Sequence, residues 1–128
     1  MIHPNEVIGE LRQPARDLRD HIPEVIGAYA SMQRAVMSDG ALSARVKELI
    51  ALAIAVTREC DGCIAAHAHA AVRHGVTLQE AAEAIGVAIL MNGGPGTVYG
   101  PRAYAAVREF HDGAGLEPAA AVHAAQHA

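Results

Sequence analysis

The chain has no Trp, one Phe and three Tyr, so aromatic residues make up only 3% of its 128 residues although 52% are hydrophobic. Large rings therefore cannot fill its core. Alanine dominates instead, with 28 residues, and alanine has the highest intrinsic helix propensity. We expect an all-α protein whose helices pack closely through small side chains.

Basic runs and long apolar runs are also missing. The ten Lys and Arg residues are scattered along a chain of net charge −4, so no surface for counterion-release binding to nucleic acid is expected. The longest apolar runs, residues 49–56 and 84–91, are too short to span a bilayer, and residues 1–13 lack the charged and apolar segments of a signal peptide. These absences predict a soluble, cytoplasmic protein that binds neither nucleic acid nor a membrane.

The length suits a single domain that spans residues 1–128. A chain this small has a high surface-to-volume ratio, and a core poor in large side chains buries little apolar area per residue. Association with further copies of the chain would supply the missing burial. We therefore expect a homo-oligomer.

Local signals divide the chain into six helical segments. They are expected at residues 5–19 with an interruption at Pro14, at 23–37, at 46–56 after an N-cap at Ser43, from a break at 59–62 to His74, at 77–91, and at 98–111 after a turn at 92–96. Pro14 should interrupt the first segment because an interior proline lacks the backbone N–H of a helix. Apolar residues on every face beyond Glu48 predict that the third segment is largely buried. Residues 117–128, with His123 and His127, could form a short or frayed tail helix.

Cys60 and Cys63 are the two cysteines of the chain and have the C-x-x-C spacing. Without a signal peptide, such a pair is expected to be catalytic, regulatory or metal-binding and not a structural crosslink. Near the start of the fourth helix, unpaired backbone amides and the helix dipole favour the thiolate of Cys63, which is the reactive form. A dithiol of this spacing can close to a disulfide and reopen, and a hydroperoxide could drive the closing through a sulfenic acid.

His67 and Glu48 are candidates for proton transfer at this dithiol. His67 follows Cys63 by four residues, so the two side chains share one helix face. Glu48 stands in an apolar helix, where a buried carboxylate needs an ion pair, a hydrogen bond or a proton. Packed beside His67, it could act as the base behind the imidazole. The adjacent Lys47 points about 100° away on the helix and is expected to face solvent.

Other interpretations of the same residues stay open. The cysteine pair could bind zinc together with a nearby histidine, namely His67, His69 or His74. Both cysteines could instead be inert residues of the core. Glu48 could be a structural carboxylate that pairs with Arg45 or Arg58.

Glu48, Cys60, Cys63 and His67 together have the spacing E-x11-C-x2-C-x3-H. This spacing resembles the signature of the alkylhydroperoxidase D-like proteins in the carboxymuconolactone decarboxylase superfamily, and residues 42–85 are similar to the central segment of that family. The resemblance implies an all-helical bundle that assembles as a trimer or hexamer and reduces organic hydroperoxides or disulfides through its thiols. Some members have a histidine between the cysteines, where this chain has Gly62.

By this resemblance, Cys63 would attack the hydroperoxide, and Cys60 would resolve the sulfenic acid and meet the reductant. His67 with Glu48 would form the proton relay, and a dithiol such as a lipoyl-type donor would restore the thiols, with no cofactor and no metal ion. The sequence therefore predicts a thiol-dependent peroxidase or disulfide oxidoreductase. The alternatives are a carboxymuconolactone decarboxylase-like enzyme that acts on a small lactone, and a nonenzymatic redox-sensing subunit of an assembly.

Overall fold

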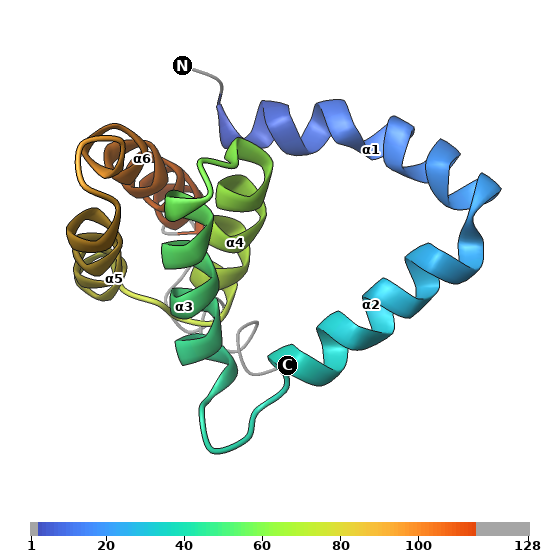
Figure 1. The fold of residues 1–128 in the computed structure, drawn as a ribbon, viewed down its shortest axis with the longest axis horizontal. Helices are drawn as coiled ribbons and strands as arrows, with labels where there is room; N and C mark the ends of the chain where they lie inside the picture. The colour runs from blue at the N-terminus through green and yellow to red at the C-terminus, as the bar shows by residue number, and fades with distance from the viewer. Residues whose placement is uncertain (1–2, 115–128) are drawn as a thin grey trace.

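The computed structural model of the protein describes residues 3–114, and within that range it contains six helices and no strand. The helices are α1 (Pro4–His21), α2 (Pro23–Met37), α3 (Ala44–Thr57), α4 (Asp61–Arg73), α5 (Leu78–Asn92) and α6 (Gly96–Ala114) (Figure 1). The prediction of an all-α fold with about six helices is confirmed. None of these six helices combines the length and the apolar character that a membrane span requires. The predicted tail helix at 117–128, with His123 and His127, lies outside the described residues.

The core lies between α3, α4, α5 and α6 and is built mainly from small side chains. Of the 15 buried apolar residues in the described part of the chain, eight are alanines. The largest fully buried side chains there are Leu52, Val56 and Val107. Because the side chains at a contact set the distance between helix axes, this composition lets the four helices approach closely.

α6 begins at Gly96, two residues earlier than the sequence predicts. Pro95 has its φ fixed near the helical value, and its carbonyl accepts the amide of Tyr99 at 3.0 Å, so the chain enters the helix directly after the turn. Gly96 lies against α5, where an added Cβ would be 2.9 Å from the Cα of Ile89. The missing side chain at this position allows the two helices to touch.

α1 and α2 form an arm that leaves the body of the other four helices and returns to it before α3 (Figure 1). α1 packs against α4, but neither α1 nor α2 contains a buried residue. Four apolar residues of α2 at helical spacing lie mostly in solvent, with exposed fractions of 61% for Val25, 63% for Tyr29, 56% for Met32 and 56% for Val36. We call these four residues the α2 stripe.

One local prediction, about helix continuity, is wrong. α1 continues through Pro14, because the helix is exposed there and water can hydrate the carbonyl that the proline leaves without a donor. The prediction that α3 is largely buried is confirmed, since Ile50 and Ile54 are its only exposed residues. α2 packs little against α3, so the position of the arm leaves these two side chains in solvent.

Lys47 is more exposed than the buried Glu48, as expected, and its side chain also has hydrogen-bond partners. Its Nζ donates to the carbonyl of Val36 at 2.8 Å and to the carbonyl of Ser38 at 2.6 Å. These carbonyls end α2 and have no amide partner within the helix, so a cation is favourable beside them. Lys47 thereby fastens the end of α2 to α3.

Candidate functional site

Cys60 and Cys63 are joined by a disulfide at the start of α4. Their Cα atoms are 5.2 Å apart, within the range of protein disulfides. A tight turn after α3 positions the pair: Glu59 has a φ of 54°, and the amide of Cys60 donates to the carbonyl of Ala55 at 3.3 Å. The turn reverses the chain, so that α4 packs back along α3.

The two cysteines have different surroundings. Cys60 is the N-cap of α4, and its Sγ accepts the backbone N–H of Cys63 at 3.2 Å. Cys60 is half-buried, whereas Cys63 is exposed. The helix start therefore stabilises negative charge most directly on the sulfur of Cys60, although the spacing alone assigns this effect to Cys63.

Glu48 and His67 lie in contact across α3 and α4. The Oε2 atom of Glu48 is 2.9 Å from Nδ1 of His67. Glu48 is 5% exposed, which makes it the one buried charged residue of the described chain, and the imidazole side chain is 26% exposed. When the carboxylate accepts the Nδ1–H, Nε2 of the imidazole is left to accept or donate a proton. The contact also satisfies a carboxylate that would be costly to bury alone.

Neither of the two alternative partners, Arg45 and Arg58, forms an ion pair with Glu48 in the described part of the chain. Arg45 forms an ion pair with Glu80 of α5. Glu80 in turn completes a capping box with Thr77, because its Oε1 accepts the backbone N–H of Thr77 at 2.9 Å. That backbone hydrogen bond is the main reason why the pKa of Glu80 is lowered. The structure thus pairs Glu48 with His67 and Arg45 with Glu80.

The zinc interpretation needs further ligands beside the cysteines. His69 packs edge-on against Phe110, with ring centroids 4.9 Å apart, and partial burial together with the charge of Arg73 lowers the pKa of its imidazole. Within residues 3–114, no three His, Cys, Asp or Glu side chains are grouped in a way that could hold a metal ion.

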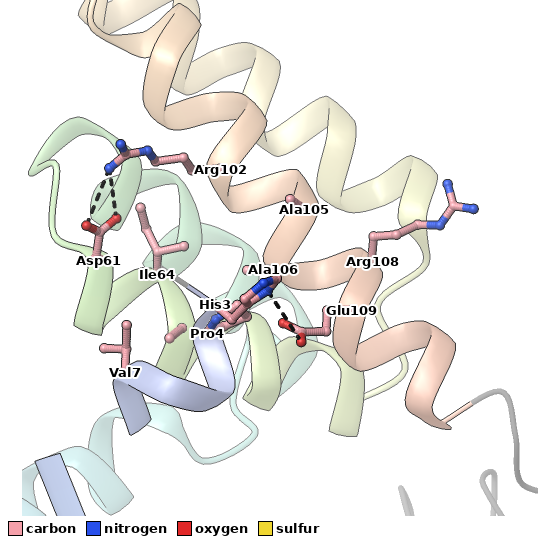
Figure 2. A pocket seen from close by; sticks show the side chains of 11 residues that line it. His3, Pro4, Val7, Asp61, Ile64, Arg102, Ala105, Ala106, Arg108 and Glu109 are labelled. Atoms are coloured by element: carbon pink, nitrogen blue, oxygen red, sulfur yellow. Dashed lines mark hydrogen bonds and ion pairs between the residues drawn. The ribbon is translucent and has the colours of Figure 1, made fainter. Parts of the chain in front are cut away.

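A further ion pair lies at the first turn of α4. Asp61, between the cysteines in sequence, faces Arg102 of α6, whose Nη1 is 3.4 Å from Oδ2. Both residues line a cavity of about 290 Å³ between α1, α4 and α6, which His3 and Glu109 also line (Figure 2). Sequence analysis did not single out Asp61 or Arg102, which are 41 residues apart. The one local signal is an acidic residue at a helix start.

Known proteins resemble most of the chain. Residues 23–109 match the model of the carboxymuconolactone decarboxylase family. The chain is 42% identical over 83 residues to an uncharacterized protein of Cupriavidus necator, a match that spans 65% of this chain and 74% of the relative. It is 39% identical over 87 residues to an uncharacterized protein from the cox locus of Paracoccus denitrificans, which corresponds to 68% of this chain and 78% of the relative. The crystal structure of the apo form of a carboxymuconolactone decarboxylase family protein from Legionella pneumophila has a TM-score of 0.82 and 34% identity to it, and the match covers 84% of this chain and 96% of the other.

Proposed function

The chain belongs to the carboxymuconolactone decarboxylase family, and from this premise we propose that it is a thiol-dependent oxidoreductase that reduces organic hydroperoxides, or disulfides of a partner. The observation that carries the proposal is the Cys60–Cys63 disulfide at a helix start. The hydrogen-bonded Glu48–His67 pair supports it, because His67 follows Cys63 by one helical turn.

In the proposed cycle, His67 accepts the proton of the Cys63 thiol, and the thiolate attacks the hydroperoxide. An S–O bond forms and the O–O bond breaks, so the substrate leaves as an alcohol after it takes a proton from the imidazolium. The Cys60 thiol then gives its proton to His67, and its thiolate attacks the sulfenic sulfur of Cys63. The disulfide forms as the S–O bond breaks, and the leaving hydroxide takes the proton back from the imidazolium and departs as water. A dithiol donor supplies two electrons and two protons to reopen it. Glu48 holds the Nδ1–H of the imidazole and stabilises its cation through both proton transfers.

The exposure of the cysteines suggests which sulfur the donor attacks. Cys63 is exposed, and a thiolate that leaves from Cys60 would keep the hydrogen bond from the backbone N–H of Cys63. A stabilised leaving thiolate accelerates thiol–disulfide exchange. We therefore propose attack at Cys63, in place of the role at Cys60 that the family resemblance implies. Iodoacetamide trapping followed by mass spectrometry would locate the donor adduct, and an adduct on Cys60 would refute this assignment.

We also propose that the protein is a homo-oligomer, either a trimer or a hexamer, in which a second copy covers the α2 stripe. All four residues of the stripe are more than half exposed. Contiguous exposed apolar surface of this kind marks protein interfaces. The small alanine-rich core gives the single chain a further reason to associate.

The central test is a steady-state peroxidase assay with cumene hydroperoxide and several dithiols, among them dihydrolipoamide. Cys63→Ser should be inactive. Cys60→Ser should react once with the hydroperoxide and stop at a sulfenic acid that dimedone labels. A wild-type protein that consumes no hydroperoxide or disulfide with any dithiol would refute the proposal, and lactone consumption by the double serine variant would assign a decarboxylase.

A further inference from the structure

A groove of about 420 Å³ lies between α1, α2 and the first turns of α4. Its walls are mainly apolar and its flank is basic; its lining includes Val7, Ile8, Leu11, Ala15, Ile26 and Ala66. Gly62, between the two cysteines, also lines it. A Cβ at Gly62 would already be 3.6 Å from Cδ1 of Leu11. This distance is an ordinary van der Waals contact. Since Gly62 lies between the cysteines, the groove reaches the turn that carries the dithiol.

Three arginines, Arg12, Arg16 and Arg19, line the same groove. Their spacing of four and three residues places them along one side of α1 over about 10 Å. In the described part of the chain none of the three has a carboxylate partner. The same is true of Arg34, Arg58 and Arg73, but these do not line the groove. Three unpaired guanidinium groups beside an apolar floor favour a ligand that carries a negative charge on an apolar body.

We infer that this groove binds a long-chain carboxylic acid. Its carboxylate would lie beside Arg12, Arg16 and Arg19, and its alkyl chain would lie along the apolar residues of the groove towards Gly62. The volume suits a ligand of that size. The inference rests on the proposed function in one respect: a hydroperoxide group on the alkyl chain of the bound acid would be the substrate. Cys63 then takes one oxygen from it, the acid leaves as its hydroxy derivative, and the dithiol donor supplies the two electrons and two protons that return the cysteines to thiols.

Binding can be tested without turnover, on the full oxidised chain. In isothermal titration calorimetry, laurate should bind about tenfold more tightly than dodecanol, because its carboxylate can form exposed ion pairs with the nearest guanidinium groups, each of which contributes a small factor. Salt should reduce this preference. A triple variant with Arg12→Gln, Arg16→Gln and Arg19→Gln should lose the preference. Arg73→Gln removes an exposed cation at the far end of α4 and serves as the matched control, which should keep it. Ala15→Phe should weaken laurate binding by filling the groove without changing its charge.

Rates of hydroperoxide reduction distinguish a failure of this inference from a failure of the proposed function. The wild type should have a higher kcat/KM for linoleic acid hydroperoxide than for its methyl ester, and the triple variant should lose this difference. Tert-butyl hydroperoxide has no carboxylate, so the two proteins should reduce it at equal rates. Reduction of tert-butyl hydroperoxide without arginine-dependent laurate binding would overturn the groove inference alone. Laurate binding that depends on the arginines, in a protein that reduces no hydroperoxide, would overturn the proposed function and leave the carboxylate site in place. Arginine-dependent binding to anionic phospholipid vesicles without binding of monomeric laurate would make the occupant a membrane surface and refute the inference.

Discussion

Replacing Glu48 by Gln tests the role of the buried carboxylate. Gln has nearly the same shape, and its side-chain oxygen can still accept the Nδ1–H of His67, so the 2.9 Å contact and the fold should persist. The substitution removes the negative charge that stabilises the imidazolium during proton transfer. Because Glu48 is 5% exposed, this charge is poorly screened by water.

The size of the effect follows from the contact. A hydrogen bond to a charged group contributes about 1.5–3 kcal/mol and a neutral one about 0.5–1.5, so loss of the charge alone costs about 1–1.5 kcal/mol, roughly tenfold in rate. General acid–base catalysis as a whole contributes about 10²–10⁴. We expect Glu48→Gln to lower kcat/KM for a hydroperoxide by about 10- to 100-fold, between these two limits.

The assay is steady-state hydroperoxide reduction with a saturating dithiol, accompanied by urea unfolding to show that each variant is folded. His67→Gln should lose a similar factor, and the double variant with Glu48→Gln should lose little more than either single variant, because the two residues act as one unit. Glu83→Gln, an exposed substitution of the same type on α5, is the control and should leave the rate unchanged. Near wild-type rates in folded Glu48→Gln would remove Glu48 from the mechanism.

Three further predictions concern assembly and stability. Tyr29→Glu places a charge on the α2 stripe and should shift the protein towards monomers in sedimentation experiments; a wild type that is already monomeric at micromolar concentration would contradict the proposed oligomer. Gly96→Ala should destabilise the fold by about 1–3 kcal/mol, since the new methyl group meets the backbone of α5, whereas Gly86→Ala, which meets no atom within 4 Å, should be neutral or stabilising in urea unfolding. The backbone N–H of Thr77 lowers the pKa of Glu80 from its ordinary value, so the ionised carboxylate stabilises the fold at neutral pH and this contribution is lost as the pH falls through the lowered pKa. The stability gap between wild type and Glu80→Gln should accordingly be present at pH 7 and close in acid, and a gap that does not change with pH would refute the assignment.

The sequence by itself determined the helices, because the signals that start and stop them are local. Pro23 at a first helical position and the Thr77–Glu80 capping box act on backbone groups only a few residues away. Gly75, with a φ of 80°, likewise follows the end of α4 as the sequence suggests. The positions of Cys60 and Cys63 at the start of α4 follow from the same signals.

Only the tertiary structure decided which residues meet and which stay exposed. Glu48 and His67 are 19 residues apart, and their contact depends on how the turn at Glu59 folds α4 back on α3. The pairing of Asp61 with Arg102 depends in the same way on the packing of α4 against α6. Apolar periodicity indicates which face of a helix is apolar, but it does not indicate whether a neighbouring element covers that face. The α2 stripe and the groove beside Gly62 are open because no neighbouring helix of the described chain covers them. This follows from the path of the arm, which depends on a few contacts with the body between residues far apart in the sequence.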